Sequence, residues 1–310
     1  AKAEFSGPLD FPTMKYHLES KILNGNLANE SFDNLTFNVT SNGKIIRIDQ
    51  AVLNKGTAQL AVTGFSNSHG IIQTKWIGKD FTLQNINNFS RTELNIDGHL
   101  DFDLELKGPI LSPDSLFKGN LSNTTISQEK VADSKFELIF KKNSIDGTGD
   151  IFGDQIRAEF KIPLTEESPF LLNAQLKKWD FVPLIHLISS RSRAAEFSTL
   201  LTADINIQSK NDFLWNANGY ANIKEFKIQR GSKELHLQQP TNINLKNGKP
   251  LFDRMILTGD NTSLDIFSSE KNQYPVFFNI NGKIDLGLLS FLTPFFDDLK
   301  GTAALTTQYA

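Results

Sequence analysis

The sequence contains no cysteine among its 310 residues. This absence excludes disulfide bonds, thiolate metal ligands and a cysteine nucleophile, and it fits an oxidising compartment, where stray thiols are a hazard. Clusters of basic residues are missing as well. The 32 Lys and Arg residues against 35 Asp and Glu residues give a net charge of -3, and no Lys/Arg run stands out. Nucleic acid is therefore not indicated as a partner.

Long apolar runs are also absent. The longest apolar cluster, 286–296, is too short for a membrane-spanning helix and contains Thr293 and Pro294. Phenylalanine dominates the aromatic residues, with 25 Phe against 4 Tyr and 3 Trp. Because the phenylalanine ring carries no polar group, this stock of aromatic side chains is suited to wholly apolar surroundings.

What the sequence does contain is alternation. Apolar residues occupy every even position from Leu100 to Leu106, acidic residues occupy the odd positions between them, and Gly108-Pro109 follows. This is the period of a β-strand with one dry and one wet face. Similar segments recur along the chain, about a dozen residues apart and separated by Asn, Gly, Asp and Pro. The pairs Asn42-Gly43, Asp146-Gly147 and Asn247-Gly248 predict hairpin turns. We therefore predict an all-β fold with an antiparallel sheet and a few short helices.

Three segments break the alternation with helix-like sequence, at 80–89, 180–188 and 285–294. Each opens with an Asp suited to capping a helix, and each continues with apolar residues three and four apart. The three Asp residues are 100 and 105 positions apart, which predicts an internal repeat of about 100 residues. The expected organisation is an N-terminal β segment at 1–79, repeat units at 80–179 and 180–284, and the start of a third unit at 285–310.

No catalytic or metal-binding pattern stands out. The five histidines are scattered, and none has a partner at metal-site spacing. Asp101, Asp103 and Glu105 share one strand face, where alternation explains them as its wet side. Nucleophile elbows, P-loops and glycine-rich dinucleotide fingerprints are missing from the sequence. We therefore expect no enzymatic activity, no catalytic residue, no metal and no cofactor.

The remaining signal is the apolar face of these strands. One interpretation is the core of an ordinary β-sandwich, and the other is an open trough that takes acyl chains. Periodicity alone does not separate the two, because both need the same one-sided alternation. The residues predicted to line the trough are Leu100, Phe102, Leu104, Leu106, Phe136, Leu138, Phe140, Ile156, Phe160, Leu172, Ile205, Ile207, Phe213, Trp215, Leu264, Ile266, Val276, Phe278 and Ile280.

A family resemblance favours the trough. A strand, a short Leu/Phe/Pro-rich helix, a Gly-x-Leu-x-Leu strand and a long meander follow one another, and the succession repeats at about a hundred residues. This pattern resembles the AsmA-like/TamB superfamily of bacterial envelope proteins. The residues that carry the resemblance are 281–294 with 299–305, 176–184, and 98–109 with 116–121.

The resemblance implies an internal periplasmic segment of a protein anchored in the inner membrane of a Gram-negative bacterium. The implied fold is an elongated, curled antiparallel sheet (β-taco-like) that forms a hydrophobic groove, through which phospholipid moves between the inner and outer membranes. The implied partners are phospholipids, the inner membrane through an anchor outside this segment, and an outer-membrane barrel protein.

Two non-enzymatic alternatives remain beside lipid transport. A scaffold could assist outer-membrane protein assembly by adding client strands to an exposed sheet edge. A surface adhesin or β-solenoid is the other, but solenoid coils have shorter and more regular repeats than the one predicted.

Overall fold

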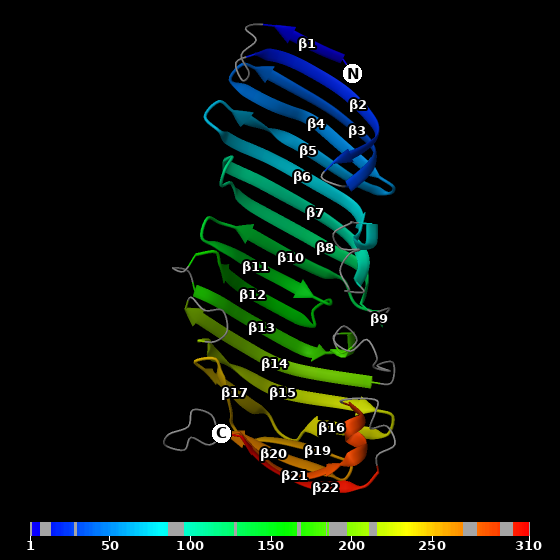
Figure 1. The fold of residues 1–310 in the computed structure, drawn as a ribbon, viewed down its shortest axis with the longest axis vertical. Helices are drawn as coiled ribbons and strands as arrows, with labels where there is room; N and C mark the ends of the chain where they lie inside the picture. Colours follow the sequence, from blue (N-terminus) through cyan, green and yellow to red (C-terminus); the bar gives the residue numbers. More distant parts are fainter. Residues whose placement is uncertain are drawn as a thin grey trace. The chain divides into compact units, whose positions relative to one another are not determined.

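The computed structural model of the chain is almost entirely β-structure (Figure 1). It divides into two compact units, which we call unit 1 (Ala1–Thr148) and unit 2 (Gly149–Ala310) and describe separately. The structure describes residues 2–6, 14–27, 30–85, 96–126, 129–165, 169–183, 185, 197–210, 216–268, 278–291 and 300–309.

Unit 1 is an antiparallel meander. Each strand from β1 to β8 pairs with the next one along the chain, β8 then pairs with β10, and the short β9 pairs with the last residues of β8. The strands are β1 (Lys2–Ser6), β2 (Lys15–Leu27), β3 (Glu30–Asn42), β4 (Ile45–Lys55), β5 (Ala58–Asn67), β6 (Ile71–Thr82), β7 (Ile96–Pro109), β8 (Asp114–Ile126), β9 (Glu129–Lys130) and β10 (Ser134–Phe140), and β11 (Ser144–Ile151) crosses the boundary between the units.

Unit 2 begins as the same kind of meander, with β12 to β15 paired in order, and then branches. One half of β15 pairs with β17 and the other half with β16. Pairing continues from β17 to β18, and from β16 through β19, β20 and β21 to β22. The strands are β12 (Ile156–Pro163), β13 (Pro169–Trp179), β14 (Phe197–Lys210), β15 (Asn218–Arg230), β16 (Lys233–Leu237), β17 (Thr241–Lys246), β18 (Lys249–Phe252), β19 (Met255–Gly259), β20 (Thr262–Ser268), β21 (Phe278–Asp285) and β22 (Thr302–Tyr309).

The predicted all-β antiparallel fold is confirmed, and the strand used above to define the alternation is β7 over its full length. Two of the three predicted hairpin turns are present, one that starts at Asn42, the last residue of β3, and one at 247–248 between β17 and β18. Asn247 and Gly248 both have the positive φ that a tight hairpin turn needs. The third prediction is wrong. Asp146-Gly147 lies inside β11, where the Asp146 carboxylate accepts hydrogen bonds from Ser144 and Lys141 instead of starting a turn.

The structure describes only part of each helix-like segment. In the first, strand β6 continues to Thr82 because that residue still pairs with His99, and the 3₁₀ turn η1 (Leu83–Asn85) follows it. The third segment contains a 3₁₀ helix, η3 (Leu286–Phe291). In the second, residues 182, 183 and 185 are helical. Residues 86–89, 184, 186–188 and 292–294 of these predictions lie outside the described residues.

The predicted aspartate caps are present in two of the three segments. The Asp180 carboxylate accepts a hydrogen bond from the backbone N–H of Val182, and the Asp285 carboxylate accepts one from Gly287. Asp80 instead has a left-handed backbone (φ 54°) at a bulge between β6 and β7. The proposed repeat boundaries at 79/80, 179/180 and 284/285 stay a prediction.

Candidate functional site

The strand register of unit 1 sorts its side chains onto two faces. Phe102 lies opposite Gly78 of β6 and Gly119 of β8, and Leu104 lies opposite Trp76 and Phe117. Side chains at paired positions share a face of the sheet. We call this the apolar face of unit 1. It comprises Leu18, Ile22, Leu35, Phe37, Val39, Ile48, Ala51, Leu53, Leu60, Val62, Trp76, Leu100, Phe102, Leu104, Leu106, Phe117, Leu121, Phe136, Leu138 and Phe140.

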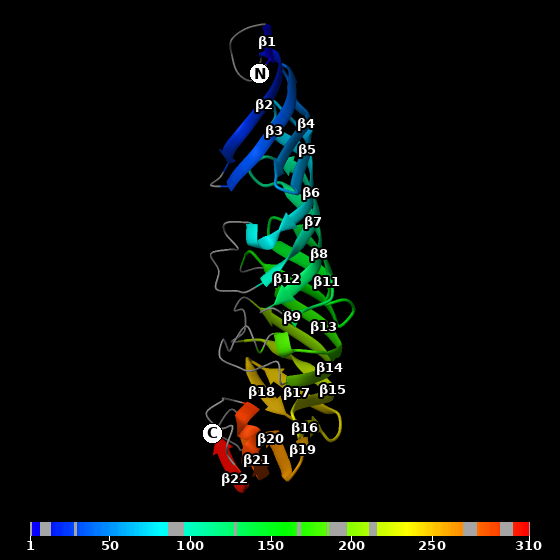
Figure 2. The ribbon, with the colours of Figure 1, turned by 90° about the vertical axis from the view of Figure 1, so that its right-hand side faces the viewer.

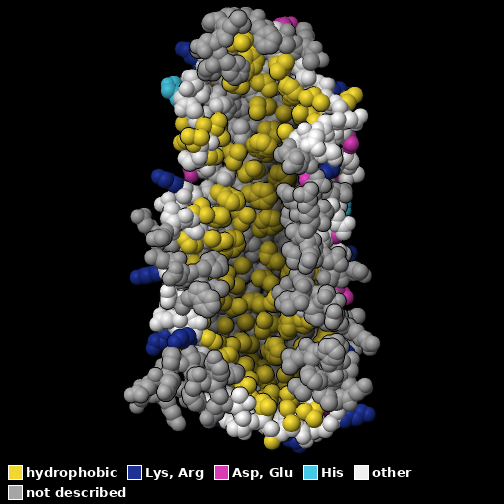
Figure 3. Space-filling view, in the orientation of Figure 1, with side chains coloured by type: hydrophobic (Ala, Val, Ile, Leu, Met, Phe, Trp, Pro, Cys, Tyr) yellow, Lys and Arg dark blue, Asp and Glu magenta, His cyan; other side chains and the backbone are white. Residues whose placement is uncertain are grey.

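Unit 2 has an apolar face built in the same way. Leu172 lies opposite Phe160 and Ile207, and Ile266 lies opposite Met255 and Ile280. Figure 3 shows hydrophobic side chains gathered along the middle of the visible face in each unit. The residues that the register places on the apolar face of unit 2 include Ile156, Phe160, Leu172, Leu176, Ala203, Ile205, Ile207, Ala221, Ile223, Ile243, Leu245, Met255, Leu257, Leu264, Ile266, Ile280 and Ile284.

Of the nineteen residues predicted to line a trough, those whose side chains the structure describes all lie on these two apolar faces. Phe213, Trp215 and Val276 lie outside the described residues. The backbone of Phe278 belongs to β21, opposite Ser268, and its side chain lies outside the described part. Whether these residues line a lipid path stays a prediction.

The apolar faces are only partly covered. Along β7, Leu100, Phe102, Leu104 and Leu106 are each half-buried, whereas fully buried hydrophobic residues are few along the described chain. In Figure 2, which views the sheet from its side, β4 to β8 lie in one layer, and no second sheet of described strands covers them. The side chains between these apolar residues, such as Asp103 and Glu105, are exposed on the opposite face.

Three phenylalanine rings of unit 1 lie over glycines of the preceding neighbouring strand. A Cβ atom at Gly78 would come within 2.1 Å of the Phe102 ring, and one at Gly119 would come within 2.4 Å of the Phe136 ring. Phe32 of β3 has the same relation to Gly25 of β2, at 2.1 Å. Because glycine has no side chain, the rings can lean onto the sheet instead of standing away from it.

Phenylalanine rings of unit 1 also contact one another across four strands, β6, β7, β8 and β10. The ring centroids of Phe81 and Phe102 are 5.5 Å apart, those of Phe102 and Phe117 are 5.4 Å apart, and those of Phe117 and Phe136 are 5.8 Å apart. The last two pairs are stacked with interplanar angles of 20° and 22°. Such offset pairs contribute about 0.5–1.5 kcal/mol each beyond burial. We call this row, Phe81–Phe102–Phe117–Phe136, the phenylalanine ladder.

A pocket of about 330 Å³ lies at one end of the ladder, within unit 1. Apolar side chains from β2 to β7 make most of its wall, and six polar side chains complete it. The apolar residues are Leu27, Phe32, Leu53, Ala58, Leu60, Phe81, Leu100 and Phe102, and the polar ones are Glu30, Ser31, Lys55, Thr57, Asp80 and Thr82. The sequence analysis assigned only Leu100 and Phe102 to a lining. The other apolar residues were missed because the strands before residue 70 alternate less cleanly than β7, although Ala58 to Val62 does follow that period.

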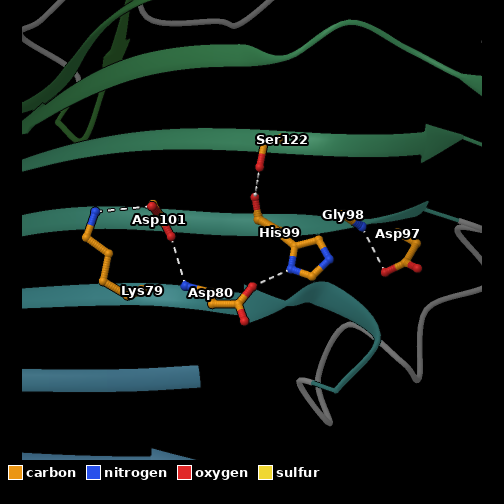
Figure 4. Close-up of polar contacts among 7 residues, drawn as sticks. All are labelled: Lys79, Asp80, Asp97, Gly98, His99, Asp101 and Ser122. Carbon is orange, nitrogen blue, oxygen red and sulfur yellow. Dashed lines mark hydrogen bonds and ion pairs between the residues drawn. The ribbon is translucent and has the colours of Figure 1, made fainter. Parts of the chain in front are cut away.

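Asp80, one of the polar residues that line the pocket, takes part in polar contacts between β6 and β7 (Figure 4). The Nδ1 atom of His99 is 2.6 Å from Oδ1 of Asp80, and the backbone N–H of Asp80 donates to the Asp101 carboxylate at 2.8 Å. Hydrogen bonds from the Thr57 hydroxyl and the His99 ring hold the pKa of Asp80 below its ordinary value. The N–H of Asp80, followed by the hydrogen bond from Lys79, lowers the pKa of Asp101.

The contact between His99 and Asp80 does not extend into a catalytic triad. The Ser122 hydroxyl donates to the backbone carbonyl of His99, at 3.5 Å, rather than to its ring. Among the residues that the structure describes, no group of three His, Cys, Asp or Glu side chains is arranged to hold a metal ion. The described part of the chain also contains no helix long and apolar enough to cross a membrane.

The opposite face of unit 1 carries cross-strand ion pairs. Lys79 Nζ is 3.1 Å from Asp101, Lys118 Nζ is 3.1 Å from Glu137, and Lys75 lies 3.9 Å from Glu105. Exposed pairs of this kind add little stability, but their charged side chains make this face of the sheet hydrophilic. The acidic residues of β7 therefore lie on the solvent-exposed face of the strand, as the alternation predicted.

The chain shows no significant match to any protein-family model, to any curated protein or to any solved structure.

Proposed function

We propose that the apolar faces form a groove that carries phospholipid acyl chains between the inner and outer membranes of a bacterial envelope. The protein would work in the periplasm, without bond chemistry. The observation that carries this proposal is the half-burial of a wide apolar face on a single layer of strands, as along β7. A sandwich core would bury such a face completely, whereas an acyl chain supplies the missing cover.

The phenylalanine rings support this use of the face. Leaning over Gly25, Gly78 and Gly119, they add apolar area without filling the space above the sheet. The pocket in unit 1 also fits a curved sheet, since six strands from β2 to β7 contribute to one wall although neighbouring strands are about 4.8 Å apart. A curved apolar face is the shape that can enclose a chain along its length.

The mechanism would be passive sliding. Each methylene group that leaves water for the apolar face gains about 0.8 kcal/mol. The residues of β7 and β10 on this face are hydrocarbon side chains that fix no particular chain position, so an acyl chain can move along them without breaking hydrogen bonds. Phospholipid head groups would remain at the edge of the groove, in contact with water. The inner-membrane anchor and an outer-membrane barrel partner belong to this proposal as expected partners outside the chain.

Native mass spectrometry with lipid extraction tests the proposal. The 310-residue chain, purified from a bacterial host, should carry phospholipid. Leu138→Asp should remove most of this lipid because Leu138 lies on the apolar face, opposite Phe117. Leu116→Asp is the matched control, because Leu116 is equally half-buried but lies on the other face, opposite Ile139 and Glu105.

A lipid-free, fully folded chain, or equal lipid loss in both variants, would contradict lipid carriage. The scaffold that adds client strands by β-augmentation would then be the better account. That scaffold predicts that peptides of outer-membrane proteins bind the chain and that Leu138→Asp leaves their binding intact.

A further inference from the structure

The polar residues of the unit 1 pocket lie close to the ends of neighbouring strands. Glu30 begins β3, Lys55 ends β4, and Asp80 lies at the bulge near the end of β6. The strand pairing brings these ends together, because Lys55 pairs with Ala58 and the next residue, Gln59, pairs with Lys79. The apolar residues Leu60, Phe81 and Phe102 line the same pocket. The pocket therefore has an apolar wall and a polar rim, which we define as Glu30, Lys55, Thr57 and Asp80.

The charges on this rim are unequal. Lys55 Nζ forms an ion pair with Glu30 at 2.8 Å, and both side chains are about one-third exposed. The Asp80 carboxylate accepts hydrogen bonds from Thr57 and His99, and within the described part of unit 1 it forms no ion pair with a Lys or Arg side chain. Two carboxylates therefore face one ammonium group, which leaves a net charge of -1 when His99 is neutral. A rim of this net charge attracts a cationic group, and its one cation, Lys55, is paired with Glu30.

We propose that the rim binds the head group of the phospholipid whose acyl chain occupies the pocket, and that it selects head groups that carry an ammonium. This inference rests on the proposed function. The head-group ammonium would lie beside Asp80, and the phosphate would lie on the side of Lys55. A phosphatidylethanolamine satisfies both ends of the rim. In phosphatidylglycerol the group that would lie beside Asp80 is an uncharged glycerol. The phosphate is then the only charge of the head group, and it has the same sign as the net charge of the rim.

The exposure of the Asp80 and His99 side chains determines how strongly the rim should prefer one head group over another. Asp80 and His99 are each about two-fifths exposed, so water weakens the attraction. One ion pair at about 4 Å in water corresponds to roughly a fivefold preference. The preference should weaken as salt rises, because the Debye length shortens from about 10 Å at 0.1 M to about 3 Å at 1 M.

The test uses vesicles that contain equal amounts of phosphatidylethanolamine and phosphatidylglycerol. The 310-residue chain is incubated with them and re-isolated, and its bound lipid is quantified by mass spectrometry. The wild-type chain should be enriched about fivefold in phosphatidylethanolamine. Asp80→Asn should bring the ratio close to that of the vesicles while total bound lipid is kept. Asp103→Asn is the matched control, since it removes an exposed carboxylate on the opposite face and should leave the enrichment unchanged.

The outcomes separate the two proposals. A wild-type chain that binds lipid in the vesicle ratio, or an Asp80→Asn chain that keeps the enrichment, overturns head-group selection and leaves lipid carriage standing. A wild-type chain that binds no lipid overturns both. If Asp80→Asn fails to fold, Glu30→Gln provides the same comparison, because it removes the other rim carboxylate at the edge of β3, and unchanged enrichment in that variant counts against the proposal.

Discussion

The ring of Phe102 lies over Gly78, and a Cβ atom at that glycine would come within 2.1 Å of the ring. Phe102 also contacts Phe81 and Phe117 in the phenylalanine ladder and lines the pocket of unit 1. One glycine thus controls how far an aromatic side chain stands from the sheet at the place where the proposed acyl chain would lie.

Gly78→Ala should destabilise unit 1 and reduce lipid binding. The new methyl group forces the Phe102 ring away from β6 and into the pocket, and overpacking of this kind typically costs about 1–3 kcal/mol. Urea unfolding and bound-lipid analysis measure the two effects. The double variant Gly78→Ala/Phe102→Leu should recover part of the lost stability, because the smaller side chain makes room. Strict additivity of the two substitutions would show that the contact has no such role.

Trp76 should report a bound acyl chain directly. It lies on the apolar face opposite Leu104, and its indole N–H donates to the Thr74 hydroxyl at 3.0 Å. In a chain with Trp179 and Trp215 replaced by Phe, lipid brominated on its acyl chains should quench the Trp76 fluorescence strongly. A tryptophan at Ile77, in a background without other tryptophans, is the control. Ile77 is opposite Asp103 on the other face, and equal quenching there would contradict an acyl chain held on one face.

Phe117→Leu should weaken the phenylalanine ladder without placing charge on the face. The substitution removes two stacked contacts, with Phe102 and Phe136. Loss of these contacts and of part of the buried ring should lower the free energy of unfolding by about 1–3 kcal/mol. Lipid binding should persist, since leucine keeps the face apolar. Complete loss of lipid in a folded Phe117→Leu chain would indicate a specific aromatic site rather than a sliding surface.

Asp285 should make the stability of unit 2 depend on pH. Its side chain is 7% exposed and lies 2.6 Å from Lys233 Nζ, and this hydrogen bond with Lys233 is the main cause of a pKa lower than the usual 3.8. Because the folded pKa lies below the unfolded one, the stabilisation is complete above about pH 5 and is lost as pH falls through the folded pKa. Urea unfolding, followed by Trp179 fluorescence between pH 7 and pH 3, measures this dependence.

Asp285→Asn should flatten that pH profile. At pH 7 the variant should be less stable by about 2–3 kcal/mol, a reduced form of the cost of breaking a buried pair, because Lys233 remains 37% exposed and can be hydrated. Asp260→Asn, at an exposed position of the same unit, should change neither stability nor its pH profile. A wild-type profile retained in Asp285→Asn would assign the pH dependence to other carboxylates.

The sequence predicted the alternation of β7 correctly because the side chains of a strand point to its two faces in turn, a local property of the backbone. It predicted two of three hairpins and missed the course of β11, where the Asp146 carboxylate bonds to Ser144 and Lys141 in place of a turn. It also placed the start of the first helix at Asp80, whereas the pairing of Thr82 with His99 extends β6 and the 3₁₀ turn begins at Leu83. Such competition between local preference and pairing involves residues distant in the chain.

By itself, the sequence determined that the protein is an antiparallel β protein with one apolar face, because the strand period and the turn residues can be read from short stretches of the chain. The lack of cysteine can be read in the same way. Only the tertiary structure decided which residues meet. The leaning of Phe102 over Gly78 and of Phe136 over Gly119 depends on the register between strands. The meeting of Glu30, Lys55 and Asp80 at one rim likewise requires that four consecutive strands, β3 to β6, be paired in order. Register sums the packing of many cross-strand pairs, and no local window of the sequence contains that sum.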